Sequence, residues 1–180
     1  AATAAASMAL MVALAAVPDF AGDVLVLSGD VPLLDADTLA SLLADHRASG
    51  AAVTLLSAVL PDATGYGRVI RAADGTVARI VEQKDATAVE AAVTEINAGV
   101  YVFRAPVLRA ELARVGTANA QGEKYLTDVI ALARAAGEQV TASVVADVTL
   151  TLGVNDRAQL AEAGRILNAR TVRRWQLAGA

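Results

Sequence analysis

The stretch that decides the fold lies at residues 23–30 and reads DVLVLSGD. Four apolar residues from Val24 to Leu27 follow one another without the alternation of a half-exposed strand. The run is bracketed by the turn-forming pairs Gly22-Asp23 and Gly29-Asp30, so it predicts a short strand buried on both faces. Such strands belong to parallel sheets covered by helices, and the run therefore predicts an α/β fold.

The segments on either side of this strand continue the α/β pattern. A helix is expected from Asp37 to about Gly50, followed by a second strand over residues 51–59, which makes a strand-helix-strand unit. Upstream, residues 4–17 are apolar but shorter than the roughly 20 residues that cross a bilayer. We therefore predict a core helix there and no membrane segment.

The rhythm changes downstream of Gly65. Residues 67–71 and 77–82 predict two strands joined by a tight turn at Asp74-Gly75, a small hairpin inserted into the α/β pattern. The remaining expected elements are a strand over 96–103, a helix over 106–114 with proline in its first turn, a helix over 124–135, a strand over 139–145 and a closing helix over 155–176.

Composition limits the functional classes. The 180 residues are 56% hydrophobic and 19% charged, which is too apolar for a disordered chain. The net charge of -4 offers no general attraction for a polyanion, so no nucleic-acid partner is expected. The absence of cysteine excludes thiolate metal sites and suits a reducing compartment, for which the cytoplasm is the default.

Asp30 is the first candidate for a functional residue, because it follows the predicted strand directly. Ligands of open α/β sheets bind beyond the carboxyl ends of the strands, and a carboxylate there suits a hard cation. The alternative is a helix cap, but Asp35 and Asp37 lie closer to the next helix and can fill that role. Gly29 lets the backbone approach a ligand closely.

The same region resembles a known family. Residues 28–34, SGDVPLL, resemble the aspartate loop of sugar-1-phosphate nucleotidylyltransferases. Later blocks agree in order and spacing with the bacterial N-acetylglucosamine-1-phosphate uridyltransferases; they read GYGR at 65–68, VEQKDA at 81–86, EINAGV at 95–100, EKYLTD at 123–128 and GVNDR at 153–157. The resemblance runs from about Ala9 to Ala180. It implies a mostly parallel, Rossmann-like sheet of the nucleotide-diphospho-sugar transferase type.

The resemblance also implies an activity. In this family the phosphate oxygen of N-acetylglucosamine 1-phosphate attacks the α-phosphorus of UTP, giving UDP-N-acetylglucosamine, a cell-wall precursor, and pyrophosphate. The reaction uses Mg²⁺, whose family ligands fall on Asp30 and Asn155. From the residues alone Asn155 is the N-cap of the closing helix, and the two roles are compatible. The substrate-binding positions that carry over are Ser28, Gly29, Asp30, Gly67, Glu82, Asn97 and Asn155.

Within this set, Glu82 and Asn97 match the pair that contacts the sugar. A carboxylate and an amide together offer acceptors and donors to hydroxyl and acetamido groups, although both residues could also be polar strand ends. Gly67 matches a glycine whose backbone touches the ligand, or it marks a strand bulge. Tyr125 and Thr127 either line the sugar pocket or pack. His46, the single histidine, is assigned no role.

Three features depart from the family. Its turn at the uracil is not matched by residues 2–9, and its C-terminal acetyltransferase domain, which follows the linker helix, is not expected in this chain. The third departure lies at the start of the family's domain. Members of the family begin with a glycine-rich loop that carries an arginine, followed by a lysine. The residues before Val24 contain no arginine or lysine, and their single glycine is Gly22. We therefore expect residues 1–154 to be a partial nucleotidyltransferase domain, truncated at its N-terminus and inactive alone. Residues 155–180 would be a closing or linker helix.

Two functions stay open at this stage. The first is uridylyl transfer in a longer parent protein, with homo-oligomeric assembly of that parent left open. The alternative is a non-catalytic α/β module that binds a sugar nucleotide or serves assembly, having lost the triphosphate-binding loop.

Overall fold

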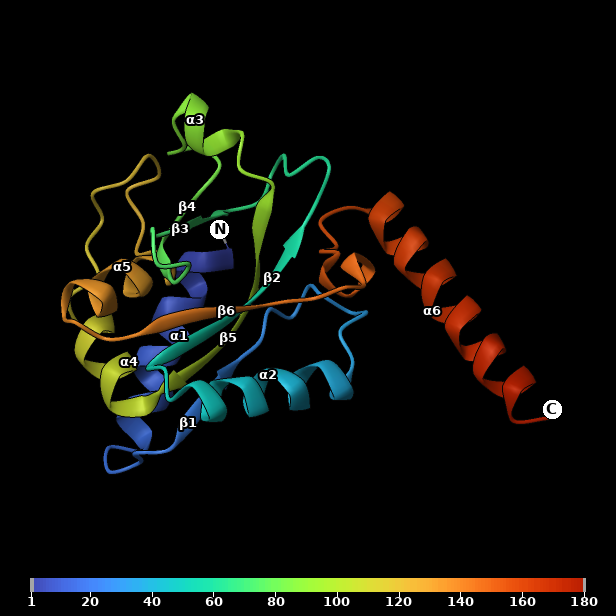
Figure 1. Ribbon diagram of the computed structural model, residues 1–180, viewed down its shortest axis with the longest axis horizontal. Helices are drawn as coiled ribbons and strands as arrows, with labels where there is room; N and C mark the ends of the chain where they lie inside the picture. Colours follow the sequence, from blue (N-terminus) through green and yellow to red (C-terminus); the bar gives the residue numbers. More distant parts are fainter. Residues whose placement is uncertain (1, 180) are drawn as a thin grey trace.

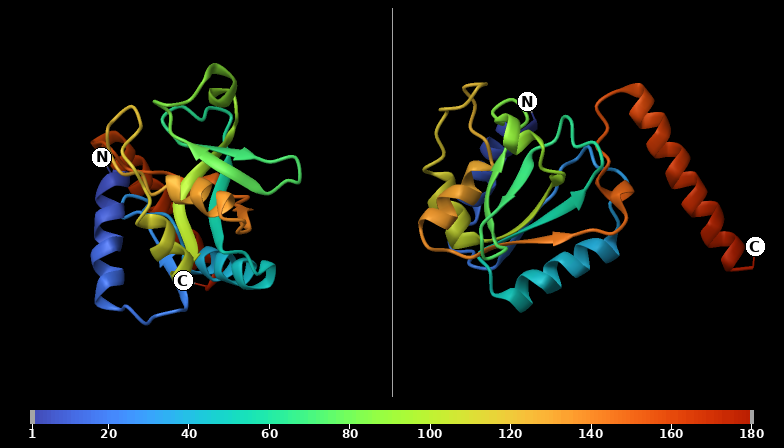
Figure 2. Two further views of the ribbon diagram at one scale, coloured as in Figure 1. Left: turned by 90° about the vertical axis from the view of Figure 1, so that its left-hand side faces the viewer. Right: turned by 45° about the horizontal axis from the view of Figure 1, so that its top comes forward.

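The architecture is an open, six-stranded sheet with helices on both faces and one long helix that projects from the body (Figure 1; Figure 2). The computed structural model describes the backbone of residues 2–179 and the side chains of residues 7–179. In chain order the elements are α1 (Ala2–Ala16), β1 (Asp23–Val26), α2 (Ala36–Ser49), β2 (Val53–Val59), β3 (Arg68–Arg71), β4 (Val77–Val81), α3 (Ala88–Ala91), β5 (Glu95–Arg104), α4 (Ala105–Leu112), α5 (Asp128–Ala135), β6 (Val140–Val144), the 3₁₀ helix η1 (Val148–Thr151) and α6 (Arg157–Leu177).

Strand β5 organises the sheet. Its order is β4-β3-β5-β2-β6, and β1 also pairs with β5. Strand β2 occupies one edge of β5 from Glu95 to Phe103. On the opposite edge, β3 meets the start of β5 at Ile96, while β1 meets its end from Tyr101 to Arg104. The stretch of β5 between these two partners is therefore left without a neighbouring strand on that edge.

The α/β class is confirmed, but the expectation of a mostly parallel sheet is wrong. Among the strand pairs of the described residues, β2 and β6 are parallel, whereas β1–β5, β2–β5, β3–β5 and β3–β4 are antiparallel. The reason is that β5 inserts between β1 and β2. These two strands run in the same direction on either side of α2, so the expected strand-helix-strand unit exists without direct pairing of its strands.

The predicted burial of β1 is also wrong. Leu25 is 39% exposed and Leu27, just beyond the strand, is 48% exposed. Only Val24 and Val26 pack against the main core. Within the described residues β1 pairs with β5 alone, so its other edge lacks the strand partner that a central strand of a parallel sheet would have.

Helix α1 is confirmed as a helix but not as a core helix. Its alanine, leucine and methionine residues favour helix, and it ends at Ala16, two residues before Pro18. Leu14 is buried, whereas Met8 and Val12 are 56% and 70% exposed. The helix packs mainly against α4, and most of its described side chains, from Ser7 to Ala16, are exposed.

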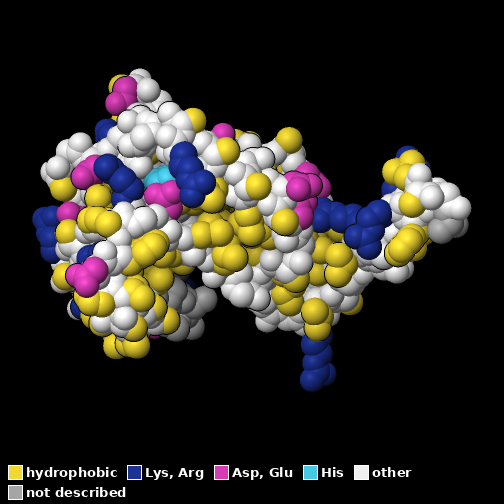
Figure 3. All heavy atoms as spheres, turned by 90° about the horizontal axis from the view of Figure 1, so that it is seen from below, with side chains coloured by type: hydrophobic (Ala, Val, Ile, Leu, Met, Phe, Trp, Pro, Cys, Tyr) yellow, Lys and Arg dark blue, Asp and Glu magenta, His cyan; other side chains and the backbone are white. Residues whose placement is uncertain are grey.

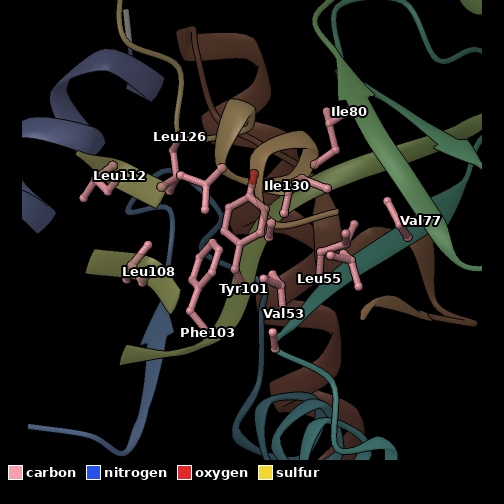
Figure 4. Packing of buried hydrophobic residues seen from close by; sticks show 14 of the residues in the cluster. Val53, Leu55, Val77, Ile80, Tyr101, Phe103, Leu108, Leu112, Leu126 and Ile130 are labelled. Carbon is pink, nitrogen blue, oxygen red and sulfur yellow. The ribbon is translucent and has the colours of Figure 1, made fainter. Parts of the chain in front are cut away.

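The core has two layers, one on each face of the sheet, as the period-two alternation of strands requires. Val53 and Leu55 of β2 and Tyr101 and Phe103 of β5 point toward α4 and α5, where they join the largest cluster (Figure 4). Leu56, Val100 and Val102, at the alternate positions of the same two strands, pack with Leu42 of α2 on the other face.

The hairpin is confirmed, with β3 and β4 antiparallel and Gly75 at φ 81° in the turn between them. The strand predicted over 96–103 and the helix predicted over 106–114 are present as β5 and α4. Helix α5 begins at Asp128, four residues after the predicted start; residues 124 and 125 are irregular and residues 126–127 form a turn.

The closing helix α6 projects from the body, and Ala163 is its buried residue (Figure 1). Arg170 ties it to the domain, donating from Nη1 to the Leu33 carbonyl at 3.1 Å and from Nη2 to Asp147 Oδ2 at 2.9 Å. Across residues 2–179 no helix combines the length and the apolar character that a membrane span needs.

Candidate functional site

A cavity of about 630 Å³ opens at the stretch of β5 that lacks a strand partner, between the carboxyl end of β1 and the start of β3. Its position agrees with the rule that ligands of open α/β sheets bind beyond strand ends. The residues predicted for the substrate all line this cavity; they are Ser28, Gly29, Asp30, Gly67, Glu82, Asn97 and Asn155. Five separate segments of the chain therefore converge on one space.

The loop after β1 is held by a bulge in β5. Between Leu55 and Ser57 of β2 the register moves from Tyr101 to Asn97 of β5, so β5 carries extra residues at this point. Gly99 lies in the bulge at φ 72°, a left-handed conformation that favours glycine. Its carbonyl accepts a hydrogen bond of 3.0 Å from Ser28 Oγ, which fixes the loop at the cavity wall.

Asp30 and Asn155 meet at one end of the cavity. The Val154 backbone N–H donates to the Asp30 carbonyl at 2.8 Å, which brings the start of α6 against the loop after β1. The capping role open to Asn155 belongs to its neighbour, because Asp156 Oδ1 accepts from the Gln159 N–H at 2.8 Å.

Asp30 does not cap the next helix either, because another residue does so. The N-cap of α2 is Asp35, whose Oδ1 accepts from the Thr38 N–H at 2.8 Å. Among the described residues, the Asp30 carboxylate and the Asn155 side-chain amide form no hydrogen bond or ion pair. The Asp30 carboxylate and the Asn155 amide are therefore both available to bind a ligand in the cavity.

Glu82 lies on the opposite side of the cavity, just after β4. Thr127, which is 1% exposed, donates from Oγ1 to Glu82 Oε1 at 3.0 Å. Burial raises the pKa of the Glu82 carboxyl, and the charges of Asp85 and Asp128 act in the same direction. Gly67 leaves room for this carboxylate, because a Cβ at residue 67 would lie 3.4 Å from Glu82 Oε2 and 3.1 Å from Ile80.

Asn97 is fixed from two sides. Its Nδ2 donates to the Tyr101 hydroxyl at 2.6 Å, and its Oδ1 accepts from the Gly99 N–H at 3.2 Å. The Asn97 backbone N–H donates to the Gly67 carbonyl at 2.9 Å, which holds Gly67 next to Asn97 where β3 pairs with β5. Sequence reasoning missed Tyr101, which lines the cavity four residues after Asn97.

A buried guanidinium supports the loop before β3. Arg68 is 2% exposed and donates to the Tyr66 carbonyl and, at 2.8 Å, to Gln83 Oε1. The same Gln83 oxygen accepts from the Gly65 N–H at 3.1 Å. Within the described residues Arg68 has no carboxylate partner at ion-pair distance; neutral acceptors bind its two Nη groups, and its buried Nε has no hydrogen-bond partner. The contacts hold residues 65–67 against the cavity.

With the geometry of the cavity established, the chain can be compared with known proteins. The model of a family described as nucleotidyl transferase matches residues 2–150. The chain belongs to the nucleotidyl transferase family. The matched residues include β1 to β6 and six of the seven predicted site residues, and the match ends before Asn155.

This nucleotidyl transferase chain is also similar to curated proteins of actinobacteria that carry the name bifunctional protein GlmU. It is 61% identical over 168 residues to the protein of Leifsonia xyli subsp. xyli, which covers 93% of the chain and 35% of the relative. Identity is 55% to the protein of Clavibacter sepedonicus and 54% to that of Mycobacterium tuberculosis, in each case over 172 residues, 95% of the chain and 35% of the relative. The chain thus spans about a third of the length of these relatives.

Not every residue considered from the sequence lies in the nucleotidyl transferase cavity. Tyr125 is 2% exposed and accepts from Gln121 Nε2 at 2.7 Å, but it does not line the cavity. Thr127 contacts the cavity only through Glu82.

His46 lies on α2, away from the cavity. Its Nδ1 lies 2.9 Å from Thr54 Oγ1 and its Nε2 lies 3.5 Å from Asp23 Oδ1. Figure 3 shows histidine between acidic and basic side chains on the underside of the molecule. Burial lowers the pKa of His46, which keeps the ring neutral in the core.

The donor set at Asp30 and Asn155 fits Mg²⁺. This ion takes oxygen ligands and is usually bound by one or two carboxylates, with substrate phosphates and water at the other positions. Asp30 offers a carboxylate and Asn155 an amide oxygen; both line the cavity, and the Val154–Asp30 backbone hydrogen bond brings their segments together. Among residues 7–179 no cluster of three or more His, Cys, Asp or Glu side chains could hold a metal ion without such additional ligands.

Proposed function

We propose that this chain is the sugar-nucleotide-binding part of a uridylyltransferase that converts UTP and N-acetylglucosamine 1-phosphate to UDP-N-acetylglucosamine and pyrophosphate. The observation that carries the proposal is the convergence of seven residues, assigned to the substrate by resemblance, on one cavity at the end of β1. The family description supports transfer of a nucleotidyl group. The similarity to the GlmU proteins supports the choice of this branch of the family.

In this proposal Glu82 and Asn97 bind the sugar. Glu82 Oε1 accepts a hydrogen bond from the Thr127 hydroxyl, and Oε2 lies beside Gly67. Oε2 can therefore accept hydrogen bonds from sugar hydroxyls. Asn97, on β5, adds a donor and an acceptor. Polar groups that are partly buried and fixed discriminate strongly, because a ligand that lacks the matching group leaves them unpaired.

The loop of Ser28, Gly29 and Asp30 would approach the nucleotide. A Cβ at Gly29 would meet nothing within 4 Å, so the backbone here borders open space that a ligand can enter. Asp30 and Asn155 would hold Mg²⁺, which when bound neutralises charge on the phosphates and orients them for transfer. A cytoplasmic location belongs to the same proposal, and so does any homo-oligomeric assembly of the longer protein.

Calorimetric titration tests the proposal with two ligands that differ only in the sugar. UDP-N-acetylglucosamine and UDP are titrated into the 180-residue chain with Mg²⁺ present. Glu82→Ala should weaken binding of UDP-N-acetylglucosamine about 5- to 100-fold, the effect of losing a buried polar partner, and leave UDP binding unchanged. Glu162→Ala, which removes a carboxylate 49% exposed on α6, is the control and should alter neither.

The proposal fails if the parent chain binds neither ligand, or if Glu82→Ala weakens both equally. A second measurement separates enzyme from binding module. If the chain binds UDP-N-acetylglucosamine but releases no pyrophosphate from UTP and N-acetylglucosamine 1-phosphate, the non-catalytic binding role holds for this chain on its own.

A further inference from the structure

Tyr101 is a core residue whose hydroxyl reaches the cavity. It is 3% exposed, and its ring packs next to Phe103 with ring centroids 5.5 Å apart (Figure 4). It belongs to the largest hydrophobic cluster and also lines the cavity. A tyrosine in this position has its ring fixed by packing, so the hydroxyl is a rigid point at the boundary between core and cavity.

The bulge in β5 brings this hydroxyl to Asn97. Residues four apart in a regular strand are separated by about 13 Å, at roughly 3.3 Å per residue. The extra residues around Gly99 interrupt the strand, and the Asn97 Nδ2 to Tyr101 Oη distance is 2.6 Å. The same bulge turns the Gly99 N–H onto Asn97 Oδ1 at 3.2 Å. One backbone irregularity therefore generates both contacts.

These two contacts determine what Asn97 can offer to a ligand. A side-chain amide has two N–H donors and two acceptor lone pairs. Tyr101 takes one donor and Gly99 occupies one lone pair, and the two partners allow only one orientation of the amide. One N–H and one lone pair remain, each with a fixed direction.

Tyr101 stays protonated throughout the physiological range, because burial raises the pKa of its hydroxyl far above the ordinary value of 10.0. The nearby Glu82 charge acts in the same direction. The hydroxyl oxygen is therefore a constant acceptor for Asn97, while its proton is free for a second acceptor.

We propose that Tyr101 is a positioning residue, whose hydroxyl orients the Asn97 amide and thereby sets the affinity of the cavity for the sugar of a sugar nucleotide. The part that concerns the sugar rests on the proposed function. The orientation of Asn97 does not, and it can be measured without any ligand.

The first measurement is an NMR experiment on the ¹⁵N-labelled, ligand-free chain. The side-chain amide signal of Asn97 is identified by its loss in Asn97→Ala. Tyr101→Phe should shift this signal and speed its hydrogen exchange at least about 3-fold, because one hydrogen bond is removed. Phenylalanine fills almost the same volume, and thermal unfolding verifies that the variant folds. An unchanged Asn97 signal in folded Tyr101→Phe would overturn the proposal.

The second measurement tests the effect on binding. Tyr101→Phe should weaken UDP-N-acetylglucosamine about 3- to 10-fold and leave UDP unchanged, which general damage to the fold would not do. In the Asn97→Ala background Tyr101→Phe should have no further effect, because the hydroxyl acts through the amide. Equal weakening of UDP, or an undiminished effect without Asn97, would contradict the positioning role.

Tyr125→Phe is the matched control. Tyr125 is also buried and also accepts a hydrogen bond from a side-chain amide, that of Gln121, but it lies outside the cavity. This variant should change neither the Asn97 signal nor the binding of UDP-N-acetylglucosamine. If the parent chain binds no sugar nucleotide, the proposed function fails, and the NMR measurement still decides whether Tyr101 orients Asn97.

Discussion

Replacing Gly99 by alanine should destabilise the protein by about 1.5–3.5 kcal/mol, the sum of a backbone cost and a lost hydrogen bond. At φ 72° an alanine is strained by roughly 1–2 kcal/mol. In addition, its Cβ would lie 2.6 Å from Ser28 Oγ, a distance that forces the hydroxyl away. The Ser28–Gly99 hydrogen bond of 3.0 Å would then break, with a loss of about 0.5–1.5 kcal/mol.

Urea denaturation of the parent chain and of two single variants measures this loss. Gly75→Ala is the control, because Gly75 has φ 81° but a Cβ there would meet nothing within 4 Å. It should show only the backbone strain, about 1–2 kcal/mol. In a Ser28→Ala background the excess loss of Gly99→Ala over Gly75→Ala should disappear. Equal losses at the two glycines would refute the role assigned to the bulge.

Four further perturbations test separate features. Because burial raises the pKa of Glu82 above its ordinary 4.5, its folded state retains the proton longer, and its contribution to stability should fall as the pH rises above about that value. Glu82→Gln should abolish this fall. For Glu90 the Thr87 hydrogen bonds lower the pKa, so stability should rise as the pH rises toward 4.5, and Glu90→Gln should remove that rise. Urea unfolding between pH 3 and 7, the range about these carboxyl pKa values, checks both signs, and equal signs would contradict the assignment. Asp156→Ala should increase amide exchange in the first turn of α6 about 5-fold, or about 1 kcal/mol, while Asn155→Ala should not. Loss of Mg²⁺ binding, measured by calorimetry with UDP-N-acetylglucosamine, should follow from either Asp30→Ala or Asn155→Ala, and unchanged affinity in both would exclude the pair as ligands.

The sequence predicted where strands and turns lie more accurately than which strands pair with one another. The apolar run from Val24 to Leu27 correctly indicates a strand, and the Asp74-Gly75 pair correctly locates the hairpin turn. The run does not reveal that β5, more than 70 residues later, pairs with β1 in the antiparallel sense. An apolar stretch predicts the conformation of its own residues, whereas their burial and strand pairing depend on segments that are distant in the chain.

Errors of one to four residues arose where several residues could perform the same local role. Asn155 and Asp156 are both good N-cap types, and only the backbone geometry shows that Asp156 caps α6.

The apolar residues of α1 suggested a core helix, yet α1 contacts mainly α4 and so keeps an exposed side. Helix propensity fixes the conformation of such a segment but not its burial.

The seven residues that resemblance assigns to the substrate line one cavity, and their role in binding stays a prediction. The contacts within the cavity could not be predicted from the sequence. The hydrogen bond between Asn97 and Tyr101 depends on the bulge at Gly99, and the signal in the sequence was a glycine within a predicted strand. The bond from Thr127 to Glu82 joins residues 45 apart, which no local pattern indicates.

A crystal structure of the chain with UDP-N-acetylglucosamine and Mg²⁺ tests the central claim most directly. The predicted result is a ligand in the cavity at the end of β1, with its sugar within hydrogen-bond distance of the Glu82 carboxylate and the Asn97 amide and its phosphates beside Asp30. A ligand bound elsewhere, or one seated in the cavity with its sugar directed away from Glu82 and Asn97, would contradict the account.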